Sequence, residues 1–188
     1  MVLDGFKKIF KCYMGIQIWG FAMVSIKDVP AEARWEIATR SANFATVARD
    51  AMLRKAFDND EIIDEIEQRI WAEGGRAVRD IAIALGLPSG NAIEIDEALG
   101  VVSAIILGPG FDAEVIEASE SRVNGRIMNC PMLNTHRELG LPTAGTHLHC
   151  QAFCENGIQG MNPQYTTRYT KRMCRGDDCC EYAIELKR

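Results

Sequence analysis

The sequence predicts an α+β protein, with a helical part over residues 1–110 and a smaller part over residues 111–188 in which helices pack on an antiparallel sheet. Three observations predict this fold class. Long helix-forming segments fill the first hundred residues, short β-compatible segments begin after the GPG at 108–110, and the last strand alternates apolar and polar residues. We expect the two parts to form one compact unit.

The overall composition is that of a soluble globular protein. The chain has 188 residues, of which 47% are hydrophobic and 25% charged. The net charge of −5 and the absence of a basic stripe in the sequence argue against nucleic acid as a partner. The apolar stretch at 13–25 is too short to cross a bilayer and ends without a small-x-small cleavage site. We therefore expect no membrane partner, a cytoplasmic location, and a buried or homo-oligomer-forming helix at 13–25.

Three long helices are predicted in order. The first follows Pro30 and extends to residue 57, and the second takes its N-cap from residues 58–60 and ends before Gly86. The third has Ser89 as its expected N-cap and ends at the GPG. Apolar residues at helical spacing are expected to form the core; they are Ile62, Ile66, Ile70, Val78, Ile81 and Leu85 in the second helix, and Ile95, Leu99, Val102 and Ile106 in the third.

The smaller part is predicted to contain two hairpins and two helices. Segments 113–123 and 124–130 are β-compatible, and Asn124-Gly125 indicates a hairpin turn between them. The stretches PMLNTHRELGLP and HCQAFCENGIQGMNP predict helices that each end at a glycine and a proline. The chain closes with a strand at 164–173, an RGDD turn, and a return strand at 179–187.

The return strand assigns its two adjacent cysteines to opposite faces. Cys180 alternates in phase with Tyr182 and Ile184, so it is expected to point toward the core. Cys179 is expected to point toward solvent.

Six of the seven cysteines fall in the last third of the chain, and Cys12 is treated as a core residue. Cys150 and Cys154 share one helix face and form a workable half of a metal site. Together with Cys130 and Cys180 they predict a tetrahedral thiolate set for zinc or an iron–sulfur cluster. The alternative is that these cysteines pack as small hydrophobic residues. A reducing compartment favours either of these over disulfides.

Candidate catalytic residues surround Cys150. In THLHC an extended backbone would place His147 and His149 on one side, as metal ligands or as a general base beside a thiolate. A helix N-terminus would lower the pKa of Cys150 and make it nucleophilic. The alternative is a polar loop whose histidines bind backbone groups. Glu155 is a candidate general acid or base, and His136 is expected at the surface.

The cysteine-bearing segments resemble a known family. The stretches NCPMLNTHRELGLP, HCQAFCENGIQGMNP and GDDCCEYAIE are similar to those of the L-2-amino-thiazoline-4-carboxylic acid hydrolase-like family, over roughly the last 65 residues. The last stretch also resembles the end of vinyl-reductase-type small-molecule-binding domains, with Gly176, Asp177 and Cys180 on the motif. The resemblance implies a small-molecule protein, and it carries over the positions Cys130, Cys150, Cys154 and Cys180.

These observations predict a hydrolase or lyase that opens a C–S or C–N bond in a small heterocyclic, or sulfur- or nitrogen-containing, substrate. Either a thiolate-bound metal with an open position acts together with His149 or Glu155, or Cys150 itself attacks. The alternative is a ligand- or metal-binding sensor module with a closed structural thiolate site. A third possibility is a structural subunit whose cysteines are all core.

Overall fold

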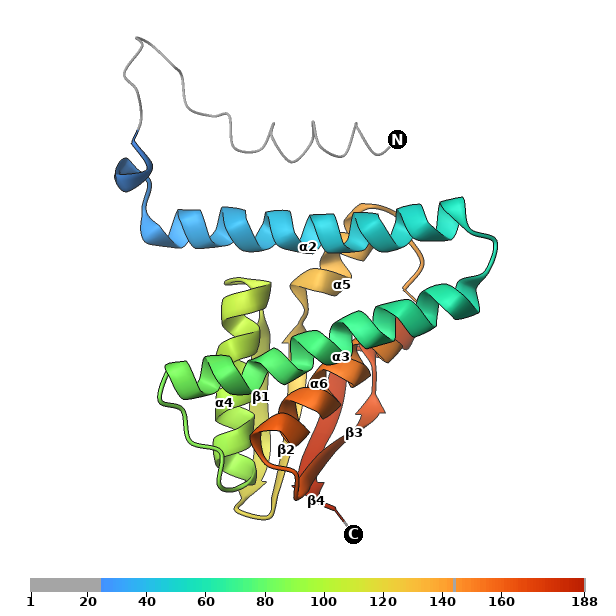
Figure 1. Cartoon of the computed structure of the whole chain (residues 1–188). Coiled ribbons are helices and arrows are strands. Elements are labelled where there is room, and N and C mark those ends of the chain that lie inside the picture. Colours follow the sequence, from blue (N-terminus) through green and yellow to red (C-terminus); the bar gives the residue numbers. More distant parts are fainter. Residues whose placement is uncertain (1–24, 144, 188) are drawn as a thin grey trace.

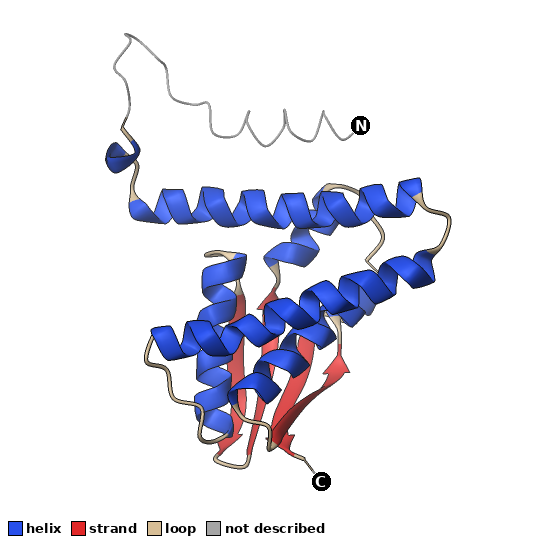
Figure 2. Ribbon diagram, viewed as in Figure 1, coloured by secondary structure: helices blue, strands red, loops and turns tan. Residues whose placement is uncertain are grey.

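A four-stranded antiparallel sheet with helices packed against one face forms the described part of the protein, as Figures 1 and 2 show. The structure is a computed structural model, and it describes residues 25–143 and 145–187. The predicted α+β class is confirmed. The apolar stretch at 13–25, apart from its last residue, and Cys12 lie outside the described residues.

The three long helices predicted from the sequence are present. They are α2 (Ala31–Ala56), α3 (Asp60–Ala84) and α4 (Ala92–Leu107), preceded by the 3-10 turn η1 (Ile26–Asp28). Asn59 caps α3 by accepting a hydrogen bond from the backbone of Ile62. The cap of α4 is Asn91, which accepts from two backbone N–H groups, so the prediction of Ser89 was wrong by two residues. Among the described helices, none combines the length and the apolar character needed to span a bilayer.

The sheet contains β1 (Asp112–Ser119), β2 (Arg122–Asn129), β3 (Tyr165–Lys171) and β4 (Cys180–Leu186), in the order β1-β2-β4-β3. The first hairpin turns at residues 120–121, so the predicted turn at Asn124-Gly125 was wrong. Both of those residues lie inside β2. Gly125 is needed there because a Cβ at this position would lie 2.4 Å from the Tyr182 hydroxyl. The glycine leaves room for a ring instead of forming a turn.

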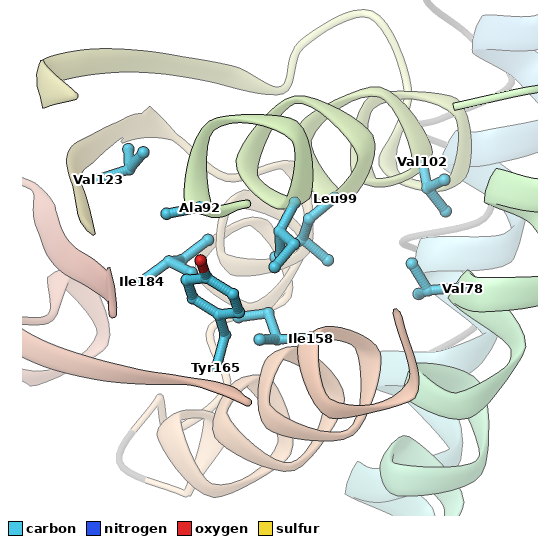
Figure 3. Packing of buried hydrophobic residues seen from close by; sticks show 9 residues of the cluster. Val78, Ala92, Leu99, Val102, Val123, Ile158, Tyr165 and Ile184 are labelled. Carbon is cyan, nitrogen blue, oxygen red and sulfur yellow. The ribbon is translucent and has the colours of Figure 1, made fainter. Parts of the chain in front are cut away.

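The hydrophobic core lies between the sheet and helices α3, α4 and α6 (Thr146–Met161), and Figure 3 shows its packing. Its fully buried members include Val78, Ile95, Val102, Ile158 and Ile184. The short helix α5 (Pro131–Glu138) leads from β2 toward α6. Burial of this apolar surface is the main stabilising contribution to the fold.

The predicted core stripe of α3 was partly wrong. Ile62, Ile66 and Ile70 are 54%, 45% and 42% exposed, whereas Ile63 is 2% and Glu67 0% exposed. Leu85 and Ile106, also expected in the core, are exposed too. The buried face of α3 is the neighbouring one, which carries Ile63 and the acid Glu67, each one residue after a predicted core position. A prediction from the spacing of hydrophobic residues alone could not include an acid, so it chose the wrong face.

Helices α3 and α6 pack closely because two glycines face each other where they meet. A Cβ at Gly75 would lie 2.3 Å from the backbone oxygen of Phe153, and one at Gly157 would lie 3.4 Å from the Gly75 oxygen. One turn back along each helix, the rings of Trp71 and Phe153 meet edge to face, with centroids 6.1 Å apart. This contact sets the register of α3 against α6, and with it the geometry of the site.

Candidate functional site

An inner cavity of about 160 Å³ lies beneath α6. Five of the α6 residues at helical spacing line it; they are Thr146, His149, Cys150, Phe153 and Cys154. Strand residues Thr167, Tyr169, Cys180, Tyr182 and Ile184 line it from the sheet. Cys180 therefore points inward as predicted.

Two thiols and a tyrosine meet on the wall of the inner cavity; we call Cys150, Cys154 and Tyr169 the thiol cluster. The Tyr169 hydroxyl donates a hydrogen bond to Cys154 Sγ over 3.1 Å and lies 3.8 Å from Cys150 Sγ. The Arg172 guanidinium stacks on the Tyr169 ring, 4.1 Å from its centroid. The two cysteines are one helical turn apart, as the sequence predicted, and their partners come from β3 and the residue after it.

The two thiols of this cluster ionise differently. The pKa of Cys150 is lowered, first because the Cys154 thiol hydrogen-bonds to it and then because Tyr169 and the Arg172 charge stabilise its thiolate. The pKa of Cys154 is raised well above its usual range by the same hydrogen bond and by burial. Burial also raises the pKa of Tyr169. The cluster therefore favours a thiolate at Cys150 and retains the proton on Cys154.

The other predicted ligands line the same cavity without joining this cluster. Burial raises the pKa of Cys130 and of Cys180, each to about 11. Cys180 Sγ accepts a hydrogen bond from the Met173 backbone over 3.3 Å, and Cys174 also lines the cavity. No described cysteine forms a disulfide. Cys179 is only 3% exposed and is not among the residues that line the inner cavity, so its predicted solvent position was wrong.

The two histidines of THLHC do not share a side. They would have done so on an extended backbone, but helix α6 already begins at Thr146. Residues two apart in an α-helix are rotated by about 200° around the helix axis, so the side chains of His147 and His149 point in nearly opposite directions. His149 faces the inner cavity, whereas His147 approaches Arg175, with 2.8 Å between His147 Nε2 and Arg175 Nη2.

Two other expectations can be placed. Glu155 accepts a hydrogen bond from Gln151 over 2.7 Å and is not among the residues that line the inner cavity. His136 is 5% exposed, so its predicted surface position was wrong. Helix α5 packs against α2, His136 lines the inner cavity, and burial lowers its pKa.

A second polar group on the cavity wall was not foreseen from the sequence. Asp50 of α2, Glu67 of α3 and His149 of α6 each place a possible ligand atom within 4.8 Å of the others, and we call them the acid–imidazole cluster. The Trp71 ring stacks on His149 with centroids 6.1 Å apart and planes inclined by 6°. The one available sequence signal was an acid, Glu67, four residues after Ile63 on the buried side of α3.

Among residues 25–143 and 145–187, the acid–imidazole cluster is the one set in which three such ligand atoms come this close. The four predicted thiol ligands share a cavity, yet they do not form a set of that kind. Zinc or iron–sulfur binding at Cys130, Cys150, Cys154 and Cys180 thus stays a prediction.

An outer cavity of about 570 Å³ adjoins the inner one. The two cavities share four lining residues, which are Asp50, His136, Thr146 and His149. Asp50 and His149 of the acid–imidazole cluster therefore border both cavities, whereas no residue of the thiol cluster lines the outer one.

Comparison with known proteins confirms the resemblance read from the sequence. A family model described as L-2-amino-thiazoline-4-carboxylic acid hydrolase matches residues 38–184, which is most of the chain. No curated protein matches the chain.

Two solved structures share the fold. One is a trafficking protein particle complex subunit 3 from Naegleria fowleri covalently bound to palmitic acid, with a TM-score of 0.59 and 16% identity over 81% of this chain and 96% of that one. The other is the phenol-responsive sensory domain of the transcription activator PoxR with phenol, with a TM-score of 0.54 and 14% identity over 75% of this chain and 74% of that one. At these identities the likeness establishes the fold alone.

Proposed function

Since this chain belongs to the L-2-amino-thiazoline-4-carboxylic acid hydrolase family, we propose that it is a hydrolase-like enzyme that opens a small heterocycle in the inner cavity. The single observation that carries this proposal is the thiol cluster, in which the Tyr169 hydroxyl lies between the sulfurs of Cys150 and Cys154 on the cavity wall. A nucleophilic cysteine needs a neighbour that stabilises its thiolate and another that can deliver a proton. The thiol cluster contains both.

The proposed reaction uses Cys150 as nucleophile. Its thiolate forms a bond to an electrophilic ring carbon, a ring C–S or C–N bond breaks, and the leaving atom takes a proton from Cys154 or Tyr169. Water then hydrolyses the covalent intermediate and restores one thiol and one thiolate. His149 lines the same cavity and is the proposed proton carrier for the water. The positions of His147 and Glu155 do not favour them for this step.

The volume of the inner cavity supports a small substrate. A cavity of roughly 150 Å³ holds a ligand the size of benzene, and the inner cavity has about 160 Å³. A five-membered heterocycle with one or two substituents fits that scale. The substrate class we propose is therefore a single sulfur- or nitrogen-containing ring.

The second candidate function is a ligand-binding sensor module. The observation that favours it is the apolar wall of the inner cavity, together with a fold shared with a sensory domain that holds phenol. In this alternative the cysteines pack around a ligand, or bind a structural metal at the predicted thiolate set, without turnover.

Location and assembly are also proposals. All six described cysteines are outside disulfides, which supports a reducing, cytoplasmic compartment. The exposed isoleucines on one side of α3 support a homo-oligomer; they are Ile62, Ile66 and Ile70. Light scattering on the full chain measures the oligomeric state directly.

The experiment compares the wild type with Cys150→Ser, and with Cys179→Ser as a matched control outside the cavity. L-2-amino-thiazoline-4-carboxylic acid is the first substrate, and peptide mapping after brief iodoacetamide treatment reports which thiol reacts fastest. We expect Cys150 to be alkylated first, and Cys150→Ser to lose hydrolysis by about a hundredfold or more. Fast labelling of another cysteine, or full activity in Cys150→Ser, would exclude Cys150 as the nucleophile.

Binding without turnover would favour the sensor alternative. Its signature is saturable binding of small ring compounds, measured by calorimetry, that Cys150→Ser leaves intact, with no product formed by the wild type.

A further inference from the structure

The acid–imidazole cluster brings three metal-ligating groups together from three helices that are distant in sequence. Possible ligand atoms of Asp50, Glu67 and His149 all lie within 4.8 Å of one another. The three residues are 9%, 0% and 6% exposed. Two carboxylates and an imidazole at this depth require compensation of their charge and hydrogen-bonding capacity.

Arginines compensate the carboxylates only in part. Arg49 donates to both oxygens of Glu67 over 3.2 and 2.8 Å, and Arg54 donates to both oxygens of Asp50 over 3.2 and 3.1 Å. A carboxylate offers about four acceptor positions, so each acid keeps capacity on its other side. An ion-pair network by itself accounts for the acids, but it leaves the histidine unexplained.

His149 has an unsatisfied nitrogen in this cluster. Its Nε2 is buried and has no hydrogen-bond partner among the described residues. Buried polar groups are almost always paired, so an orphaned one calls for a specific explanation such as an absent ion. The imidazole ring stacks in parallel on Trp71, and one of its nitrogens lies within 4.8 Å of both carboxylates. His149, with a buried and unpaired nitrogen beside two carboxylates, is therefore a candidate metal ligand.

The arginines can make room for a cation. Arg54 also pairs with Asp60 and Asp64, so it keeps acidic partners if Asp50 turns to an ion. The Arg49 side chain is 43% exposed and can move toward solvent. The cluster also borders both cavities, through Asp50 and His149, so an ion has an entry path.

We propose that Asp50, Glu67 and His149 bind one divalent first-row transition-metal ion, such as Zn²⁺ or Mn²⁺. Carboxylate and imidazole ligands suit these ions, whereas Ca²⁺ and Mg²⁺ prefer oxygen alone. Three protein ligands leave at least one coordination position for water or for a molecule in the cavity. The site uses none of the cysteines predicted as ligands. It shares His149 with the proposed function, and an imidazole nitrogen that binds the ion cannot also carry the proton for the water, so the two roles of His149 are alternatives.

Co²⁺ is the probe that separates this site from a thiolate site. The full chain is purified without a metal-affinity tag, treated with chelator, dialysed and titrated with CoCl₂ while the absorption spectrum is recorded. Oxygen and nitrogen ligands give only weak visible d–d bands, and thiolate ligands add an intense near-ultraviolet charge-transfer band. We expect one Co²⁺ per chain, without the charge-transfer band. Calorimetric titration with ZnCl₂ measures the affinity.

Matched variants identify the ligands. His149→Ala and Glu67→Gln are each expected to weaken Zn²⁺ binding by about a hundredfold or more. Their controls are His147→Ala, on another side of α6, and Glu65→Gln, on the exposed side of α3, and both are expected to bind as the wild type does. If circular dichroism shows that either test variant fails to fold, Asp50→Asn replaces it as a near-isosteric change.

Three outcomes would overturn the proposal. The first is no binding of Co²⁺ or Zn²⁺ above that of the Glu67→Gln variant. The second is full binding in folded His149→Ala and Asp50→Asn. The third is a thiolate charge-transfer band that disappears in Cys150→Ser, which would return the metal to the cysteines. None of these readouts uses catalytic activity, so the proposed function can fail while the metal site stands, and the reverse also holds.

Discussion

The thiol cluster and the acid–imidazole cluster use adjacent residues of one helix, Cys150 and His149, yet they are assembled differently. The thiol cluster takes Tyr169 from β3, which follows α6 directly in the chain. The acid–imidazole cluster takes Asp50 and Glu67 from α2 and α3, which come much earlier in the chain. A cluster built from chain neighbours can therefore be found in the sequence, whereas one that depends on helix register remains hidden.

The two clusters also differ in how their charge is stabilised. In the thiol cluster the Arg172 guanidinium stacks on the Tyr169 ring, and its charge favours the Cys150 thiolate. The acid–imidazole cluster contains two carboxylates that are each paired with an arginine. Variants that act on one cluster and leave the other unchanged therefore test whether the two are independent.

The largest expected effect is on the helix packing that builds the acid–imidazole cluster. Gly75→Ala places a methyl group 2.3 Å from the Phe153 backbone oxygen, so α3 has to shift away from α6. Such overpacking costs about 1–3 kcal/mol in the free energy of unfolding. Urea unfolding measures this loss. The ratio of alkylation rates at Cys150 and Cys154 should remain unchanged, because the thiol cluster is formed by α6 and β3 and contains no residue of α3.

Gly157→Ala is the matched control on the other side of this contact. Its new methyl group would meet neighbours at 3.4 Å or more, which is ordinary packing distance. The gain in helix propensity is roughly 1 kcal/mol, so the variant should be neutral or more stable. Equal destabilisation by the two variants would contradict the close approach of α3 at Gly75.

A smaller effect is expected on the thiol cluster. Tyr169→Phe removes the hydroxyl next to both sulfurs and should leave the fold intact. Because that hydroxyl helps to lower the pKa of Cys150, its loss raises this pKa and reduces the thiolate population at neutral pH. We expect alkylation of Cys150 at pH 7 to slow by roughly fivefold, and its pH profile to move upward.

Tyr165→Phe is the control for this change. The Tyr165 hydroxyl donates to the Glu120 backbone, and Tyr165 is not among the residues lining the inner cavity. Alkylation rates should match those of the wild type. An unchanged profile in Tyr169→Phe would show that the hydroxyl does not tune Cys150.

The smallest expected effect is a pH dependence of stability from His136. Burial lowers its pKa in the folded state, so the folded protein disfavours the charged form. Its contribution to stability is present above an unfolded pKa near 6.5 and is lost as the pH falls through the lowered value. His136→Gln should therefore unfold with a weaker pH dependence between about pH 7 and pH 5, by less than roughly 1 kcal/mol. Unfolding at pH 8, where the wild-type imidazole is neutral, gives the baseline cost of the substitution, and an unchanged slope would contradict the assignment.

The sequence predicted the fold well where helix-forming residues, or a regular alternation of apolar and polar residues, fill a whole segment. The helices α2, α3 and α4 lie within a few residues of their predicted bounds, because helix-forming runs with glycine, proline or asparagine at their ends leave little freedom. The inward position of Cys180 followed from strand alternation alone. The predicted hairpin turn at Asn124-Gly125 was wrong because Gly125 lies inside β2, where its lack of a side chain leaves room for the Tyr182 ring.

For the site, the sequence was enough to show that Cys150 and Cys154 share a helix face, because a helix repeats every 3.6 residues. It could not determine that His149 meets Asp50 and Glu67, because that contact depends on how closely α3 approaches α6 at Gly75. It could not separate the exposed Ile66 from the buried Glu67 either. Periodicity defines the faces of a helix, and only tertiary packing decides which of those faces is buried and what it meets there.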